Sequence, residues 1–217
     1  NDADLWNSGK THSPSSVLVP YMGRELGSRS LCCWKVRVWD QNDRPSGWSQ
    51  IEYFSVGLLD KSDWQASYIG FPVTNKTASS PQLRKTFNLK ARGDRVFLHV
   101  NSLGYHEVYV NGEKVSENIL APAVSQFNKR SLVITYDISR HVKKGRNDIV
   151  LWIGQGWYRK GLPGVVSDIP LVKAQIEQLR DNNWNTVVVT DSSWTGRNSG
   201  YSMTGTWSPG RFGAERV

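Results

Sequence analysis

Short stretches of alternating apolar and polar residues, separated by turn-forming residues, dominate the chain, and helical periodicity is almost absent. The clearest stretch covers residues 31–39, where Trp34, Val36 and Val38 alternate with polar or basic side chains. Because successive side chains of a strand point to opposite faces, this pattern predicts a half-buried strand with a basic solvent face. A polar turn follows, and residues 48–56 then predict the returning strand of a hairpin.

After a linker at residues 57–66, further strand signals follow at short intervals. We predict strands at residues 82–89, 95–101, 107–110, 132–137, 148–153, 171–179 and 186–189. Asn111-Gly112 is a strong hairpin signal, because a type I′ turn needs positive φ at both central positions, and residues 144–147 predict another turn. Short strands without a repeat period predict an all-β protein, built as a sandwich or jelly roll.

Composition supports a folded β protein and narrows its partners. The hydrophobic fraction is only 38%, but ten tryptophans supply large side chains that can build a core. The net charge is +8, yet the basic residues are scattered along the chain, which argues against a nucleic-acid partner. No apolar run is long enough to span a membrane. No signal peptide is recognisable at Asn1, so the chain starts as though cut from a longer protein.

Cys32 and Cys33 are the only cysteines, and they are adjacent. In a strand they would point to opposite faces, and neighbouring cysteines rarely reach disulfide geometry. We therefore expect ordinary strand residues rather than a staple or a metal pair, and their role stays open.

A series of motifs in the first part of the chain carries a family resemblance. The motifs are Trp34–Asp40, Ser46–Ser49, Phe54, Gly57-Leu58 and Asp63–Ala66. In the second part they continue as Pro81–Phe87, Leu103–Gly112, Leu120–Ala123, Thr135–Ile138, Gly154–Arg159, Ala174–Ile176 and Asp191–Trp194. Together, in this order, they resemble the N-terminal region of bacterial α-L-rhamnosidases over roughly residues 4–217.

The resemblance implies a domain organisation. Residues 1–60 would be the C-terminal part of a fibronectin-III-like sandwich, whose first strands are missing before Asn1. Residues 61–217 would be the rhamnosidase N-terminal jelly-roll domain, ending before the (α/α)₆ barrel that carries the catalytic acid and base. The parent protein would then be a periplasmic or secreted bacterial hydrolase of terminal α-L-rhamnosyl linkages, and its catalytic domain would be the partner of this chain.

The residues themselves give no sign of a complete active site. Inverting glycoside hydrolysis needs a pair of carboxyl groups, one of them protonated, but the carboxylates here mostly flank turns and form no recognisable acid–base motif. The histidines are dispersed (His12, His99, His106 and His141), and nothing has zinc-ligand spacing. We predict no catalytic residue, and we expect this fragment to be inactive alone and to require no cofactor.

Sugar binding has a few candidate residues. Trp157, Tyr158 and Arg159 follow a Gly-x-Gly turn that could present them to a carbohydrate, although core packing is the simpler explanation for Trp157. Some members of the family use an acidic residue and an asparagine with calcium to hold rhamnose. By that resemblance Glu117 and Asn118 are candidate Ca²⁺ ligands, with Asn118 also touching sugar, while a solvated loop is the simpler explanation.

Three functions therefore remain in view. The first is an accessory β unit of an α-L-rhamnosidase, which serves domain packing and substrate recognition. The second is a calcium-assisted module that binds rhamnose or another carbohydrate. The third is an adhesion-type sandwich without sugar affinity.

Overall fold

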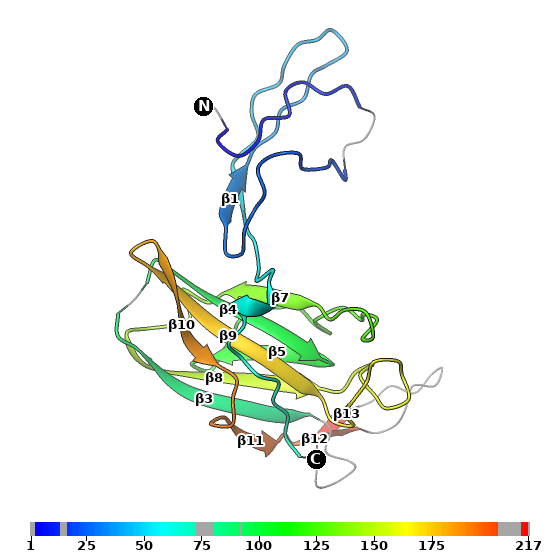
Figure 1. The fold of residues 1–217 in the computed structure, drawn as a ribbon, viewed down its shortest axis with the longest axis vertical. Helices are drawn as coiled ribbons and strands as arrows, with labels where there is room; N and C mark the ends of the chain where they lie inside the picture. The colour runs from blue at the N-terminus through cyan, green and yellow to red at the C-terminus, as the bar shows by residue number, and fades with distance from the viewer. Residues whose placement is uncertain (1–2, 14–16, 73–79, 92, 204–213, 217) are drawn as a thin grey trace. The chain divides into compact units, whose positions relative to one another are not determined.

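The structure is a computed structural model that describes residues 3–13, 17–72, 80–91, 93–203 and 214–216 of the chain. Strands dominate the described residues, and their one helical segment is a short 3-10 turn, η1 (Lys61–Asp63) (Figure 1). The all-β class is therefore confirmed, and no described helix has the length and apolar character needed to cross a bilayer. The chain divides into two compact units, Asn1–Asp63 and Trp64–Val217. The domain boundary after residue 60 stays a prediction.

The first unit is built on a hairpin of β1 (Leu31–Trp34) and β2 (Glu52–Ser55), paired antiparallel as the sequence predicts. Both strands are shorter than expected. Beyond β1 the backbone N–H of Val36 donates to the Ser49 hydroxyl at 3.0 Å, while the Ser49 N–H donates to the Val36 carbonyl at 2.8 Å. A side-chain oxygen thus replaces a backbone carbonyl in the ladder, and regular pairing stops there.

The apolar side chains of this hairpin do not form the half-buried face that their alternation predicts. Trp34, Val36 and Val38 are 50%, 51% and 67% exposed, because the described part of the unit contains a single two-stranded sheet without a second layer over them. The two cysteines do point to opposite faces, since Cys32 is buried and Cys33 is exposed. That expectation is confirmed.

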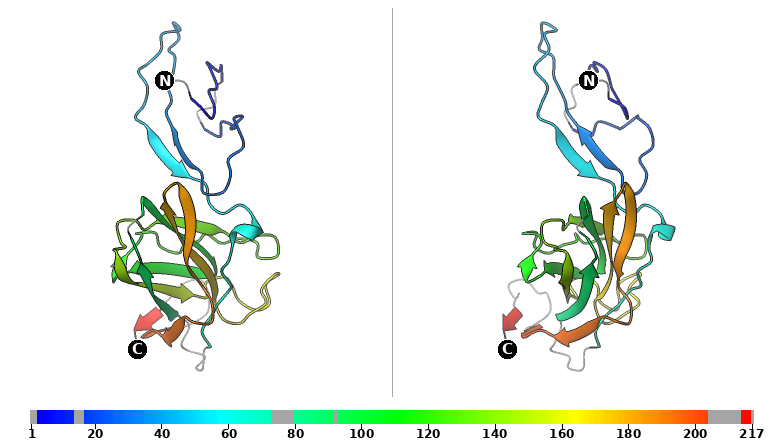
Figure 2. Two further views of the ribbon diagram at one scale, coloured as in Figure 1. Left: turned by 60° about the vertical axis from the view of Figure 1, so that its left-hand side comes forward. Right: turned by 90° about the vertical axis from the view of Figure 1, so that its left-hand side faces the viewer.

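The second unit is a jelly-roll β-sandwich of two antiparallel sheets (Figure 2). The four-stranded sheet has the order β10-β9-β4-β7, with β4 (Arg95–Leu103), β7 (Val133–Asp137), β9 (Leu171–Arg180) and β10 (Asn183–Val189). The five-stranded sheet has the order β11-β3-β8-β5-β6, with β3 (Pro81–Leu89), β5 (Tyr105–Val110), β6 (Glu113–Lys114), β8 (Gly145–Gly154) and β11 (Thr195–Asn198). A separate pair joins β12 (Tyr201–Met203) to β13 (Ala214–Arg216). Every strand predicted in this unit is present.

The core lies between these two sheets. Leu98 of β4, Leu151 of β8 and Ile176 of β9 belong to one cluster and are each at most 1% exposed. Burying one such side chain stabilises the fold by about 1.5–3 kcal/mol. Because side chains alternate along each strand, the residues between these core positions point away from the sandwich interior.

Of two turns predicted from the sequence, one is present and the other is not. Asn111 and Gly112 have φ of 53° and 89°, as the predicted type I′ hairpin requires. The turn predicted at 144–147 is wrong, because β8 already begins within that range and pairs with β3. The fully buried Asn147 explains the difference: its side chain accepts the N–H of Lys143 at 2.9 Å and donates to the carbonyl of the same residue at 2.7 Å, closing the turn earlier.

Candidate functional site

The outward face of the five-stranded sheet carries polar and aromatic side chains in cross-strand rows. Adjacent strands place Arg197, Gln82, Trp152 and Glu107 opposite one another in turn. The neighbouring row contains Thr195, Arg84, Val150, Tyr109 and Lys114. Residues that are far apart in the sequence are thereby brought to one surface.

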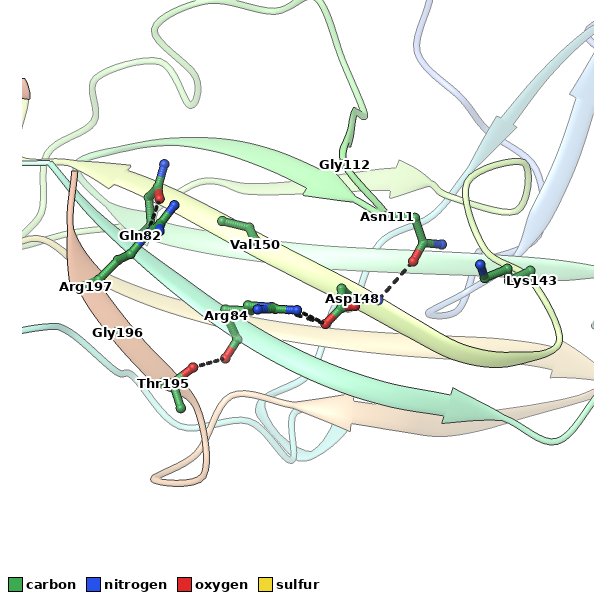
Figure 3. Close-up of a pocket in the computed structure, with 10 residues that line it drawn as sticks. All are labelled: Gln82, Arg84, Asn111, Gly112, Lys143, Asp148, Val150, Thr195, Gly196 and Arg197. Atoms are coloured by element: carbon green, nitrogen blue, oxygen red, sulfur yellow. Dashed lines mark hydrogen bonds and ion pairs between the residues drawn. The ribbon is translucent and has the colours of Figure 1, made fainter. Parts of the chain in front are cut away.

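Two hollows on this face join into one groove, because Gln82 and Arg197 line both of them. The first has a volume of about 600 Å³ and the second about 440 Å³. We call their union the sheet groove. The side chains that give the first hollow its chemistry are Gln82, Arg84, Asn111, Lys143, Asp148 and Arg197 (Figure 3). Volumes of this order are typical of small-molecule sites.

An ion pair lies in the first hollow. Arg84 Nη2 donates to Asp148 Oδ1 at 2.8 Å, and the Thr86 hydroxyl donates to the same oxygen at 2.6 Å. The Thr86 hydrogen bond, followed by that of Arg84, lowers the pKa of the Asp148 carboxyl. Asp148 is therefore ionised near neutral pH and already satisfied by its neighbours.

Two further cations line the groove without such a partner. Arg197 Nε donates to Gln82 Oε1 at 2.8 Å, which leaves the two terminal nitrogens of its guanidinium. Lys143 is exposed. Neither cation forms an ion pair with a residue that the structure describes, and Figure 3 shows them toward opposite ends of the Arg84–Asp148 pair. The groove thus has a surplus of positive charge.

Aromatic rings continue the surface beside the cations. The ring centroids of Trp152 and Tyr201 are 5.3 Å apart, and those of Trp152 and Tyr109 are 6.4 Å apart. Trp152 Nε1 donates to the carbonyl of Ser80 at 3.1 Å, which fixes the indole. Trp152 and Tyr201 both line the second hollow, so two aromatic rings lie among its polar side chains.

The carboxylate nearest to these rings is also engaged. Glu107 accepts hydrogen bonds from Lys114 Nζ at 2.7 Å and from the Tyr109 hydroxyl at 2.8 Å. Burial alone would raise the Glu107 pKa, but these two hydrogen bonds outweigh it and the pKa is lowered. Burial, followed by the hydrogen bond to Glu107, raises the Tyr109 pKa to about 12.

The two carboxylates of this surface, Asp148 and Glu107, are both held in the ionised form. An inverting glycosidase needs one carboxyl group that stays protonated to act as the acid. Both Asp148 and Glu107 have lowered pKa values, so neither supplies that group near neutral pH. The arrangement can hold a ligand by charge, hydrogen bonds and ring contacts.

The three residues predicted for sugar binding after β8 separate in the structure. Trp157 is 42% exposed and Arg159 is exposed, whereas Tyr158 is completely buried. The Tyr158 ring packs edge-on against that of Phe127, with ring centroids 5.1 Å apart, and the Tyr158 hydroxyl accepts a hydrogen bond from the N–H of Val166 at 3.3 Å. Tyr158 therefore anchors the turn, and only its two neighbours face solvent. Their role in sugar binding stays a prediction.

Glu117 and Asn118 lie in an exposed loop after β6, where the Asn118 N–H donates to the Ser116 hydroxyl at 3.1 Å. A calcium ion takes about six to eight oxygen ligands, so this pair would need water or sugar oxygens to complete the shell. Among the residues that the structure describes, no group of three or more His, Cys, Asp or Glu side chains could hold a metal ion. Calcium binding here stays a prediction.

The sheet groove was not predicted from the sequence. Its signal was present as polar residues at alternate positions of β3 and β8, such as Gln82, Arg84 and Asp148. That pattern shows which side chains point outward. It does not show that β11 pairs with β3 and brings Arg197 to the same surface.

Two family descriptions match the chain. "Alpha-L-rhamnosidase N-terminal domain" matches residues 91–216, and "Rha78A-like, N-terminal immunoglobulin domain" matches residues 1–60. The second match gives the first unit an immunoglobulin-like class, consistent with the sandwich expected there.

Relatives and solved structures agree with these matches. An α-L-rhamnosidase of Formosa agariphila is 31% identical over 92% of this chain, and one of Alteromonas sp. (strain LOR) is 32% identical over 91%. The crystal structure of α-L-rhamnosidase from Dictyoglumus thermophilum superposes with a TM-score of 0.76 at 28% identity over 92% of the chain. The chain spans only 23% of each of the two relatives and 24% of that structure.

Proposed function

The chain belongs to the α-L-rhamnosidase N-terminal domain family, and we propose that it is a non-catalytic accessory part of such an enzyme. The parent would hydrolyse terminal α-L-rhamnosyl linkages in glycans or glycosides. Its catalytic domain would lie elsewhere in the same protein, and the β units described here would support that domain by packing and take part in substrate recognition.

One observation carries this proposal. The similarity runs along nearly the whole chain, yet that length is 23% of the relatives it matches. The outward face of the second unit adds a chemical reason, because its carboxylates Asp148 and Glu107 are held ionised by neighbouring donors. A part of this size, with such groups, fits support and recognition better than bond cleavage.

The proposal is tested by removing these residues from the parent protein. We expect the remainder to keep its catalytic groups but to lose thermal stability, and to turn over a rhamnosylated glycan less well than the whole protein does. Thermal unfolding and kcat/KM on p-nitrophenyl α-L-rhamnoside and on the glycan measure these effects. An unchanged midpoint together with unchanged kcat/KM on both substrates would contradict an accessory role.

A second candidate is direct sugar binding beside the turn after β8. The observation that favours it is the exposure of Trp157 and Arg159 on a turn that the buried Tyr158 anchors. Glu117 and Asn118 would add calcium-assisted contacts. Titration calorimetry with L-rhamnose, with and without calcium, tests this: heat that depends on calcium and disappears in Asn118→Ala is expected. No heat at millimolar sugar would favour a sandwich without rhamnose affinity.

We also propose that the parent is periplasmic or secreted, because its expected substrates are glycans outside the cell. The relatives from Formosa and Alteromonas are bacterial proteins. Fractionation of a bacterial host that expresses the whole parent protein tests this, since recovery in the cytoplasm alone would contradict it.

A further inference from the structure

We propose that the sheet groove binds an oligosaccharide that carries acidic groups, either uronate carboxylates or sulfate esters. The site lies on the outward face of the five-stranded sheet and is separate in sequence from the loop residues considered above. The inference goes beyond the accessory role, because it concerns binding by this chain alone.

The charges of the groove point to an anionic ligand. Asp148 is neutralised by Arg84 and the Thr86 hydroxyl, whereas Arg197 and Lys143 have no ion-pair partner in the described part of the chain. Charge-assisted hydrogen bonds from such cations to carboxylate or sulfate oxygens are stronger than those between neutral groups. The two terminal nitrogens of Arg197 can donate parallel hydrogen bonds to two oxygens of one acidic group, a bidentate geometry that a lysine does not offer.

The rings point to a sugar as the carrier of that charge. Trp152 and Tyr201 wall the second hollow, and Tyr201 is 37% exposed. Flat aromatic faces pack against the C–H surfaces of pyranose rings, while planar polar groups hold the hydroxyls. Gln82 supplies such a group, because its carbonyl oxygen accepts from Arg197 and its amide nitrogen is left to donate.

The shape and the remaining charges favour an acidic glycan over a nucleic acid. Cations line the first hollow, and the second hollow adds two aromatic rings beside Arg197, which suits a short chain of sugar rings with intermittent acidic groups. The positive surplus of the groove comes from only two side chains, Arg197 and Lys143, which fits scattered acidic groups better than a backbone with a phosphate at every residue. A glycan can carry hydroxyls between its acidic groups.

Titration calorimetry of the 217-residue chain tests the inference with two pairs of probes. The first pair is tetragalacturonate and its methyl ester, and the second is a sulfated galactan tetrasaccharide and its desulfated form. We expect at least one acidic probe to bind, about tenfold or more tighter than its neutral counterpart, and more weakly as salt is raised. The two acidic arms tell carboxylate from sulfate recognition.

Matched variants locate the binding. Arg197→Ala and Lys143→Ala should each lower the affinity for the acidic probe by about tenfold. Lys129→Ala removes an exposed cation that does not line the groove, so it should leave the affinity unchanged. All three sites are on the surface, so unchanged unfolding midpoints confirm that the variants fold.

Three results would overturn the inference: equal binding of acidic and neutral probes, full binding by the Arg197 and Lys143 variants, or no heat from any probe at millimolar concentration. None of these depends on rhamnoside hydrolysis, so the accessory role stands or falls separately.

Discussion

His106 should make the second unit sensitive to mild acid. Its imidazole is buried in β5 between two neutral partners, the Ser102 hydroxyl at 2.7 Å and the Tyr136 hydroxyl at 2.9 Å. A neutral imidazole satisfies both, donating through one ring nitrogen and accepting through the other. Protonation would place a positive charge in the core, and neither of these two partners is a carboxylate that could balance it. Burial therefore lowers the His106 pKa to about 4.

The size of the effect follows from this shift. Between the ordinary histidine pKa of 6.5 and the folded value of about 4, the unfolded chain binds more protons than the folded one. The free energy of unfolding is therefore highest above the upper value and falls as the pH falls toward the lower one. The shift corresponds to about 3 kcal/mol in full and to roughly 2 kcal/mol at pH 5.

Urea denaturation followed by tryptophan fluorescence at pH 7 and pH 5 measures this loss. His106→Gln keeps an amide that can hydrogen-bond but does not titrate, so the loss between the two pH values should shrink by roughly 2 kcal/mol. The carboxyl groups are the same in both proteins, so the difference between the two losses reports His106. An equal pH dependence in the variant and the unaltered protein would refute the assignment.

Three further predictions test the fold. In urea denaturation, Leu151→Ala in the core should lower the free energy of unfolding by about 2–5 kcal/mol, and Val150→Ala on the outward face by less than about 1 kcal/mol. Equal losses in the two variants would contradict the assignment of faces. Gly104→Ala should lower the thermal midpoint more than Gly112→Ala, because both have positive φ but only at 104 would Cβ lie 2.2 Å from a carbonyl oxygen. Asp63→Asn should cost the first unit about 1–2 kcal/mol at neutral pH, and this loss should shrink as the pH falls through about 2, because hydrogen bonds from a serine hydroxyl and then an arginine lower the Asp63 pKa to about 2; a loss that stays the same below that pH would contradict this.

The fold was readable from the sequence where one local rule governs it. Strict alternation predicted the long strands, and Asn111-Gly112 predicted a turn whose φ values the structure confirms. Strand and turn bounds differ from the prediction where a side chain takes the place of a backbone partner, as Ser49 does beside Val36 and as Asn147 does at the start of β8. Whether a side chain takes the place of a backbone partner depends on which strand lies alongside. Local periodicity does not show which strands are neighbours.

The candidate site was harder to predict for the same reason. Alternation could assign Gln82, Arg84 and Trp152 to an outward face, but only the pairing of β11 with β3 adds Arg197. The sequence also did not distinguish exposed from buried neighbours. Trp157 is exposed, whereas Tyr158, next to it in the sequence, is fully buried. The order of the motifs was enough to predict the family. Predicting the groove would have required the register between strands that are far apart in the chain.

The most direct test of the central claim is a hydrolysis assay on the isolated chain. Purified residues 1–217 are incubated with p-nitrophenyl α-L-rhamnoside, with the whole parent protein as the positive control. An accessory, non-catalytic part predicts no release of p-nitrophenol above the uncatalysed rate, while the parent turns over. Turnover by the isolated chain that persists after repurification would contradict the account.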